Sequence, residues 1–298
     1  MQDNLDSRQD FNIDIAEIFQ ILIGKRFQLI FITLTFSILA VIYSLTLDNY
    51  YESSSTFQIS IETNNNSATS GISSIASLAG ISVGQQDSKV SFVKETLLSR
   101  AFFKRLIEKD NEILPNLLAF NYFDGTIKKS IFDNSSYDKG EWKIRKPTYL
   151  EGYEEFKDIF QVEIDDVTGF IKVFVIHKSP VFASNLIYLS FVELNLLSRE
   201  KDISETKNLI TYLEQEFSNT SILDIRESIN NLITSQLKKK MYATVKQDYL
   251  VKFVEPPFVP ERKSGPVRSL ICIFITLLGF MFGVVYILLK RYLIIRNN

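Results

Sequence analysis

Two long apolar runs without a charged residue, one near each end of the chain, constrain the fold most strongly. They are Phe27–Leu47 and Ser269–Leu289, each of 21 residues. In a helix, this length extends about 31 Å, which matches the hydrocarbon core of a bilayer. A helix in a soluble protein rarely stays apolar on every face over this length. We therefore predict transmembrane helices at residues 27–47 and 267–289.

The charges that flank the first run predict its orientation. Arg8, Lys25 and Arg26 precede it, whereas the next 20 residues after it contain no Lys or Arg. The positive-inside rule then places both termini in the cytoplasm of a two-pass protein. A cleaved signal peptide is the alternative, but the run exceeds the roughly 7–15 apolar residues of such a peptide and no small-residue cleavage site follows.

The predicted organisation has five parts. These are a cytoplasmic tail (1–26), the first span (27–47), an exported domain (48–266), the second span (267–289) and a second cytoplasmic tail (290–298). Both tails are too short for a kinase or response domain, and the sequence contains no GxxxxGK[ST] phosphate-binding motif. The net charge of −2 gives no basis for nucleic acid as a partner.

The exported domain is expected to be held by packing, because the only cysteine, Cys272, lies in the second apolar run. Alternating apolar residues predict strands, and helical spacing predicts helices. The predicted strands are 55–61, 170–177 and 248–254. The first carries Phe57, Ile59 and Ile61 on one face, and the second is apolar on both faces and is therefore expected to be central. The predicted helices are 90–109 and 150–160. Turns are predicted at Asp124-Gly125, Lys139-Gly140 and 167–169, and a loop at 62–88.

A long helical pattern begins at Ser179-Pro180, a helix cap followed by a first-turn proline. We predict that residues 179–243 form a limb that extends from an α/β base made of 48–178 and 244–266. A single helix from Pro180 to Ala243 would reach about 96 Å. A hairpin broken near Asn219, with a second helix capped by Ser221, is equally compatible.

The apolar stripe of the limb exceeds what one chain can bury, which predicts packing between copies. The residues predicted to mediate oligomerisation are Leu213, Ile222, Ile225, Ile229 and Leu232. The expected fold is therefore α+β: a membrane-proximal base with a long helix or helical hairpin, between two transmembrane helices. Glutamate at Ile225 or Ile229 should disrupt the oligomer by burying an unpaired charge.

Four polar features could suggest chemistry. The single histidine, His177, ends a predicted strand and is expected to be structural. Asp165-Asp166 and Glu154-Glu155 are adjacent acids, which do not by themselves form a catalytic pair across a cleft. Lys238–Lys240 is expected to be a solvated helix face. We predict no catalytic residue, no cofactor and no metal site.

Several segments then form a recognisable series. IDIAEIFQILIGKR (Ile13–Arg26) precedes the first span, and SSSTFQISI (Ser53–Ile61) covers the first predicted strand. ASLAGI (Ala76–Ile81) and FVKETLLSR (Phe92–Arg100) follow, and PERKSGPVRSLI (Pro260–Ile271) leads into the second span. This series resembles the chain length determinant (Wzz-type) family, the polysaccharide co-polymerases of bacterial inner membranes.

The most specific part of the resemblance is the proline segment before the second span. Pro257, Pro260 and Pro266 match the prolines of the family, whereas Lys263 stands where the family often has another. The second span contains Gly279-x-x-x-Gly283, a spacing that permits close packing of transmembrane helices, although ordinary glycine usage explains it as well.

The resemblance implies a non-enzymatic, ring-forming regulator of surface polysaccharide chain length, such as that of O-antigen in lipopolysaccharide. The implied partners are further copies of the chain, a Wzy-type polymerase, the growing lipid-linked glycan and membrane lipids. An alternative within the superfamily is capsule or exopolysaccharide export with an ABC transporter or a separate tyrosine kinase. A two-span sensor is a third class, but the 290–298 tail has no room for an output domain.

Overall fold

The computed structural model describes residues 22–60, 85–125, 129–138 and 140–296. The chain divides into two compact units: Tyr50–Lys263 is one, and the residues before and after it form the other. The segments 13–21 and 76–81 that contributed to the family resemblance, and most of the predicted loop 62–88, lie outside the described residues.

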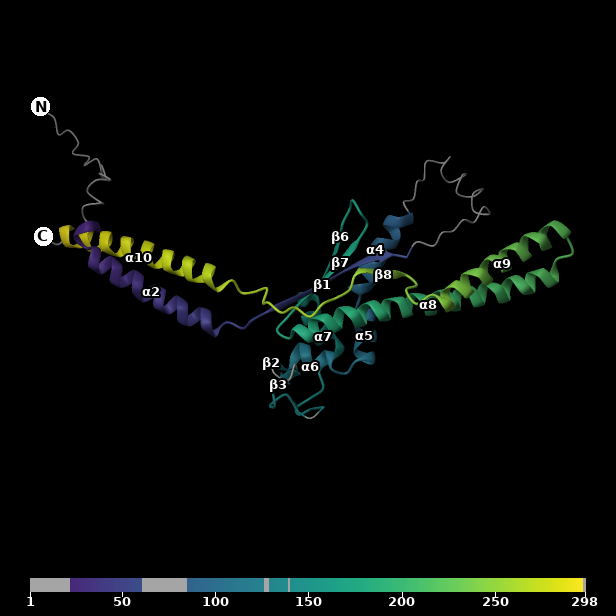
Figure 1. Ribbon diagram of the computed structural model, residues 1–298, viewed down its shortest axis with the longest axis horizontal. Helices are drawn as coiled ribbons and strands as arrows, with labels where there is room; N and C mark the ends of the chain where they lie inside the picture. The colour runs from purple at the N-terminus through teal and green to yellow at the C-terminus, as the bar shows by residue number, and fades with distance from the viewer. Residues whose placement is uncertain (1–21, 61–84, 126–128, 139, 297–298) are drawn as a thin grey trace, which may run out of the picture. The chain divides into compact units, whose positions relative to one another are not determined.

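The unit formed by the two chain ends is a pair of helices. α2 (Arg26–Thr46) and α10 (Arg268–Arg296) lie side by side (Figure 1). The rings of Phe36 and Phe282 are 5.9 Å apart between the helices. Arg268 donates a hydrogen bond from Nη2 to the Leu47 carbonyl oxygen at 3.0 Å. Most apolar side chains of the pair nevertheless stay exposed, among them Phe27, Phe31, Leu45, Ile273, Phe274 and Leu278.

Three helices of the described chain are long and apolar enough to cross a membrane: Arg26–Thr46, Pro180–Asn219 and Arg268–Lys290. They differ in what covers them. The apolar window of the middle helix is 56% buried within the structure, against 11% and 17% for the first and third. The middle helix therefore satisfies its apolar side chains within the fold, whereas the other two do not.

The core of the Tyr50–Lys263 unit is built on an antiparallel sheet of four strands in the order β6-β7-β1-β8. The strands are β1 (Tyr51–Ile59), β6 (Phe160–Ile164), β7 (Ile171–His177) and β8 (Val251–Glu255). β7 has a neighbour on each side, which confirms the prediction that it is an interior strand. The first and last strands of the unit are themselves neighbours, so both connections to the helix pair leave from adjacent strands.

β1 begins four residues before the predicted start at Ser55. Its inward face carries Ser53 and Ser55 before Phe57 and Ile59. The hydroxyl groups of the two serines donate hydrogen bonds to the carbonyl oxygens of Phe258 at 2.7 Å and of Glu255 at 2.6 Å. Serines with hydrogen-bonded hydroxyls thus occupy buried positions of the strand at which the sequence has no apolar residue. Ile61, predicted on the same face, lies outside the described residues.

β6 was not predicted, and it forms a hairpin with β7. The two strands pair from Phe160 opposite Val175 to Ile164 opposite Ile171. The connecting turn contains the predicted 167–169 segment, and Gly169 adopts a φ of 68°. This left-handed conformation favours glycine over residues with a Cβ.

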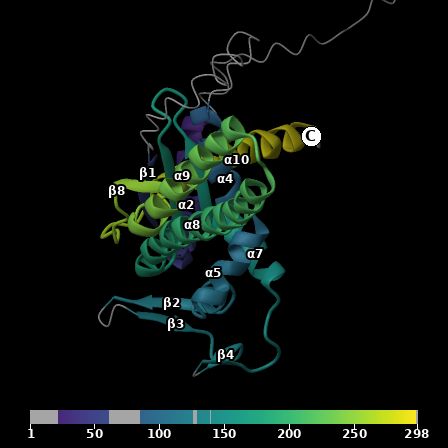
Figure 2. The same ribbon diagram turned by 90° about the vertical axis from the view of Figure 1, so that its right-hand side faces the viewer.

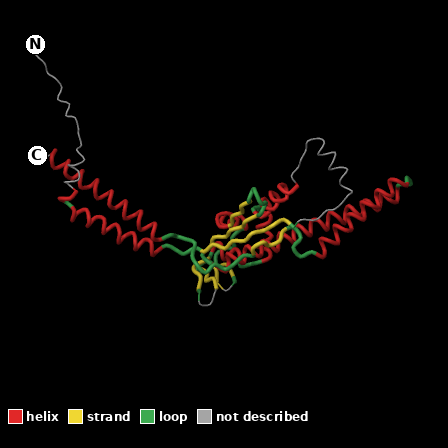
Figure 3. Tube along the Cα trace, turned by 45° about the horizontal axis from the view of Figure 1, so that its top comes forward, coloured by secondary structure: helices red, strands yellow, loops and turns green. Residues whose placement is uncertain are grey.

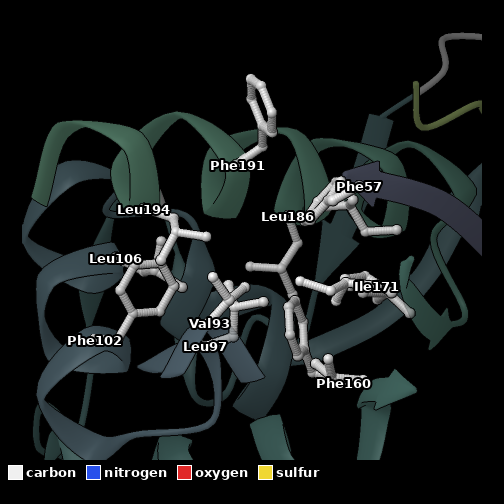
Figure 4. Packing of buried hydrophobic residues seen from close by; sticks show 14 of the residues in the cluster. Phe57, Val93, Leu97, Phe102, Leu106, Phe160, Ile171, Leu186, Phe191 and Leu194 are labelled. Carbon is white, nitrogen blue, oxygen red and sulfur yellow. The ribbon is translucent and has the colours of Figure 1, made fainter. Parts of the chain in front are cut away.

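Helices from two parts of the chain cover the sheet. α4 (Gln85–Leu97), α5 (Arg100–Lys109), α6 (Ile113–Leu118) and α7 (Tyr149–Ile159) precede the long α8 (Pro180–Asn219). Their apolar side chains meet those of the strands in one core, shown in Figure 4: Phe57, Val93, Leu97, Phe102, Leu106, Phe160, Ile171, Leu186, Phe191 and Leu194. The predicted helix 90–109 is in fact two helices, because Ser99 caps a new helix at Arg100.

α8 has two halves with different surroundings. From Pro180 to Asn195 it packs in the core of the domain, where nine of its apolar or small residues are buried, against the sheet and α5 among others. Beyond this point it pairs with α9 (Leu223–Val245) and extends away from the sheet (Figures 1 and 3). The limb predicted to begin at residue 179 therefore begins about four turns later, because the first half of α8 supplies core to the base.

The structure decides between the two predicted forms of the limb. α8 ends at Asn219, α9 begins at Leu223, and the two helices contact each other as a hairpin. The break lies where the sequence predicted it. The predicted cap at Ser221 is wrong, because Ile222 occupies the cap position without a side-chain hydrogen bond. The Arg226 guanidinium lies 4.3 Å from the centre of the Phe217 ring beside this turn.

Two small hairpins complete the domain. β2 (Phe120–Asp124) pairs with β3 (Lys129–Phe132), and β4 (Tyr137–Asp138) pairs with β5 (Glu141–Trp142). They lie on the side of the domain away from the α8–α9 hairpin (Figure 2). The turn signals at Gly125 and Gly140 fall between these strands, and Gly140 has a φ of 92°. The strands themselves are too short for an alternating pattern to reveal them.

Candidate functional site

The α8–α9 hairpin carries the five residues predicted to mediate oligomerisation. Leu213 and Ile229 are each 8% exposed, and so they are buried within the hairpin of a single chain. Ile222, Ile225 and Leu232 are 58%, 44% and 51% exposed. The structure therefore separates the predicted set into two residues that hold the hairpin together and three that remain available to a partner.

The surface of the hairpin exposes further large apolar side chains. Together with the three above they extend along both helices: Leu209, Tyr212, Leu223, Leu237, Met241 and Val245. Scattered exposed apolar residues are normal, but a long helical pair with this many is typical of a surface that contacts another molecule. We call this set, with Ile222, Ile225 and Leu232, the limb surface.

The root of the hairpin is fixed to the domain by polar contacts. The Asp202 carboxylate on α8 accepts hydrogen bonds from Lys239 Nζ of α9 at 2.9 Å and from the Tyr249 hydroxyl at 2.6 Å. The Arg199 guanidinium donates to the carbonyl oxygens of Lys246 and Gln247 at 2.6 and 2.8 Å. These contacts hold the end of α9 and the start of β8 against α8, so the hairpin is anchored at its base.

A second polar cluster connects α5 with α8. Arg105 donates from Nε to Glu193 at 2.7 Å and from Nη1 and Nη2 to Glu200 at 2.8 and 3.1 Å. The hydrogen bonds to Glu200 and Glu193 raise the pKa of Arg105 further above its usual value, and the bond from Arg105 lowers the pKa of Glu200. The buried Glu193 is thus paired, as a buried charge must be.

Sequence analysis did not single out this cluster, although a signal is present. Glu193 is the one charged residue between Pro180 and Ser198, a stretch otherwise suited to a core helix. A lone acid in such a stretch predicts a basic partner on a neighbouring element, but the sequence does not say which of the many basic residues it is.

The proline segment follows β8 directly. The strand ends at Glu255, before Pro256 and Pro257, and the chain then runs without regular structure to α10 at Arg268. Pro260 is buried, and Pro266 lies two residues before α10. Because proline has no amide hydrogen to donate, the segment cannot extend the ladder of β8.

The two glycines of α10 face α2. A Cβ built at Gly279 would overlap the Cβ and the ring of Phe36. A Cβ built at Gly283 would lie 3.5 Å from the nearest atom of Ile32, an ordinary contact. The geometry thus gives Gly279 the closer approach, and the role of both glycines in packing within a membrane stays a prediction.

His177 is part of the core, as its isolation in the sequence suggested. Its Nδ1 accepts a hydrogen bond from the Ser179 amide at 2.9 Å, and its Nε2 donates to the Asn116 carbonyl oxygen at 3.0 Å. The rings of Phe120 and Phe182 pack against the imidazole, with ring centres 4.9 and 4.7 Å from its centre. Burial lowers the pKa of His177 to about 4, so the imidazole is neutral at physiological pH.

The acidic pairs and the lysine run also have structural partners. The Asp165 carboxylate accepts hydrogen bonds from the amides of Val167 and Thr168 at 3.0 Å, and these bonds lower its pKa. Glu154 pairs with Lys157 on the same helix at 2.7 Å. Lys239 of the lysine run binds Asp202. In the described part of the chain, no group of three His, Cys, Asp or Glu residues is arranged to hold a metal ion.

The comparisons with known proteins give one family. Residues 12–109 match the family model "Wzz: Chain length determinant protein". The matched range runs through α2, β1, α4 and α5. No curated protein matches the chain.

Two solved structures are similar at low identity. The first, "full-length bacterial polysaccharide co-polymerase", is 14% identical over 95% of this chain and 99% of that chain, with a TM-score of 0.42. The second is a fragment of WzzB, a polysaccharide co-polymerase from Salmonella Typhimurium, 16% identical over 73% of this chain and 100% of that chain, with a TM-score of 0.27. The match of residues 12–109 to the chain length determinant (Wzz) family model agrees with the resemblance that the sequence shows.

Proposed function

We propose that this protein is a non-enzymatic regulator of surface polysaccharide chain length, acting as a homo-oligomeric co-polymerase in the bacterial inner membrane. The observation that carries the proposal is the match of residues 12–109 to the chain length determinant family. The finer parts are a Wzy-type polymerase as partner and a lipid-linked glycan such as O-antigen as the regulated polymer. These parts follow from the function of that family.

The membrane arrangement is a further part of the proposal. α2 and α10 are the two spans, because their apolar side chains are exposed to whatever surrounds the pair. α8 is not a span, because more than half of its apolar window already packs within the domain. With Lys25 and Arg26 before α2, the positive-inside rule then places the Tyr50–Lys263 unit in the periplasm and both termini in the cytoplasm.

The non-enzymatic assignment rests on what the candidate catalytic groups are occupied with. His177 is locked between two backbone groups in the core, and Asp165 accepts the amides of its own turn. A group that acts as a general acid or base must reach a substrate proton, which the burial of His177 prevents; the Asp165 carboxylate stabilises its own turn. The proposal therefore assigns the protein a binding and organising role.

Gene deletion in the source bacterium tests the proposal. Without the gene, the length distribution of the surface glycan on a silver-stained gel should lose its preferred length while the repeat unit is still made. Complementation with the intact gene should restore the preferred length. A ladder that stays unchanged in the deletion strain would reject chain-length regulation.

The same experiment separates the export role. If the chain serves export with a transporter, deletion should leave polymer inside the cell and reduce the amount at the surface. If it regulates length, the total amount at the surface should change little. Quantifying surface and intracellular polymer in the deletion strain distinguishes the two.

A further inference from the structure

A cavity of about 500 Å³ lies between the end of α5, the start of α6 and the β4–β5 hairpin. This volume falls within the roughly 300–1,000 Å³ that is usual for small-ligand sites. Apolar side chains from Ile107 and Leu114 form one part of its lining, and the hairpin forms the other. The cavity lies wholly within the Tyr50–Lys263 unit and is separate from the limb surface.

Two aromatic rings form the hairpin side of the cavity. Tyr137 and Trp142 are directly opposite each other on β4 and β5, with ring centres 5.0 Å apart. The rings of Phe132 and Tyr137 pack edge to face, with their centres 5.3 Å apart. Neither Tyr137 nor Trp142 is fully buried, so both keep surface toward the cavity. Trp142 is also the only tryptophan in the protein.

Three polar side chains line the same cavity: Asn111, Glu141 and Lys146. Together they offer an amide that both donates and accepts, a carboxylate that accepts and an ammonium that donates. Nearby charges are occupied, since Lys143 pairs with Asp138 at 3.4 Å and Arg145 with Glu151 at 2.9 Å. Within the described residues Glu141 and Lys146 make no ion pair.

We propose that this cavity binds a hexose ring of a polysaccharide. One face of such a ring presents C–H groups, which pack on an aromatic face, and its rim presents hydroxyls, which need both donors and acceptors. Tyr137 and Trp142 supply the first, and Asn111, Glu141 and Lys146 supply the second. The single carboxylate and the single ammonium cancel in charge, which favours a neutral sugar over a phosphate. That the sugar belongs to a polymer rests on the proposed function.

The site suggests how a regulator could sense the polymer. A pocket on the domain surface that holds one sugar ring weakly would retain a growing glycan beside the protein, and the retention would increase with the number of repeats and of copies engaged. The limb surface and the sugar pocket would then have separate tasks: assembly of copies, and contact with the glycan.

Tryptophan fluorescence tests the proposal directly, because the emission comes from Trp142 alone. The full chain in detergent micelles is titrated with oligosaccharides released from the lipid-free surface polysaccharide of the same bacterium. We expect a saturable shift of the emission and protection of Trp142 from quenching by acrylamide. An emission spectrum and quenching constant that stay unchanged throughout the titration would overturn the proposal. So would a response to a casein hydrolysate, a mixture of peptides, without one to the oligosaccharides.

Variants identify the residues involved. Asn111→Ala removes an exposed polar group and keeps the tryptophan, so it should fold normally and bind about 3- to 10-fold more weakly. Trp142→Ala, measured by calorimetry because its reporter is lost, should weaken binding more than tenfold. Tyr122→Ala removes an exposed aromatic residue of β2 outside the cavity and should bind normally. Equal affinity of Asn111→Ala, Tyr122→Ala and the unchanged chain would assign the sugar to another surface.

The outcomes for this site and for the proposed function are independent. If the deletion strain loses its preferred glycan length but purified chain shows no fluorescence response, the sugar pocket is wrong and length regulation stands. If the response is present but the ladder is unchanged in the deletion strain, the pocket stands and the regulatory function is rejected.

Discussion

Single hydroxyl groups set where three helices of this domain begin. Ser99, Thr148 and Ser179 each accept a hydrogen bond from the backbone amide three residues later, at 3.1, 3.4 and 3.3 Å. A cap of this kind contributes about 1 kcal/mol. The cap at Ser99 divides α4 from α5, and the cap at Ser179 starts α8 beside His177. Individual capping residues thus determine where these helices begin.

The first prediction concerns the pH dependence of stability. The pKa of His177 falls from 6.5 to about 4 on folding, so between these values the unfolded chain binds a proton that the folded chain does not. The stability that the neutral His177 contributes is therefore present above about pH 6.5 and is lost as the pH falls toward 4. The loss between pH 7 and pH 5 should be about 2 kcal/mol.

Urea unfolding of the detergent-solubilised chain, followed by the fluorescence of Trp142, measures this loss. His177→Gln is the matched control, because it removes the only histidine of the sequence. The variant should be less stable at pH 7 and should show a smaller loss between pH 7 and pH 5. Identical losses in both proteins would mean that His177 titrates as in the unfolded chain.

The second prediction concerns the glycines of α10. Gly279→Ala should push α2 and α10 apart, because the new methyl group meets Phe36, at a cost of about 1–3 kcal/mol. Gly283→Ala adds the same methyl group at ordinary contact distance and should be neutral. The thermal midpoint of the helical signal in detergent compares the two. Equal midpoints would contradict the close approach at Gly279.

At the scale of elements, the α8–α9 hairpin combines two kinds of apolar residue. Leu213 and Ile229 pack within the hairpin, and the limb surface faces outward. Contacts of Asp202 and Arg199 fix the root of the hairpin, and so its outer part extends from a firm base. A limb of this form presents its apolar surface at a defined position relative to the domain, as the proposed assembly of copies requires.

The third prediction separates the two kinds of residue. Ile225→Glu changes an exposed position, so the stability of one chain should change by no more than about 0.5 kcal/mol while the oligomer dissociates. Ile229→Glu places a charge inside the hairpin and should destabilise the chain itself by about 2–4 kcal/mol. Light scattering after chromatography reports the oligomer, and thermal unfolding reports the chain.

Asn231→Glu is the control for this pair, because it adds the same charge at an exposed polar position of α9. It should leave both the oligomer and the thermal midpoint unchanged. An Ile225→Glu variant that keeps the full oligomer would show that the limb surface does not mediate assembly.

At the scale of the whole molecule, the two compact units differ in where their apolar side chains lie. The α2–α10 pair keeps most of its apolar side chains outside, as suits a lipid environment, whereas the Tyr50–Lys263 unit gathers a core of them inside and exposes others on the limb surface. Both chain ends of the latter unit leave from the neighbouring strands β1 and β8. A domain connected in this way returns the chain beside the point where it entered, as the proposed two-pass arrangement requires.

The fourth prediction tests this topology with single cysteines. Cys272→Ser gives a chain without cysteine, and Val167→Cys then adds one at a turn position that is 95% exposed. A membrane-impermeant maleimide should label Val167→Cys in cells with a permeable outer membrane. Asn298→Cys should be labelled only after the inner membrane is broken. Labelling of both before lysis would reject cytoplasmic termini.

The sequence by itself determined the elements whose signals are local. The two apolar runs, the interior strand at β7 and the cap at Ser179-Pro180 all follow from periodicity, charge and turn residues within a few positions. The sequence marked Asn219 as a place where the limb could break, and the structure decided that it does. The role of His177 in the core was predicted from its isolation in the sequence. Even the turns at Gly125 and Gly140 were visible, although the short strands around them were not.

The tertiary structure decided everything that depends on which residues meet. Buried serines in β1 carry no apolar signal, so only their bonds to Phe258 and Glu255 explain the length of that strand. The apolar stripe of α8 looks continuous in sequence, yet its first half packs on the sheet and its second half on α9. Periodicity shows that a helix has an apolar face, but the partner of that face is fixed only when the chain folds back on itself.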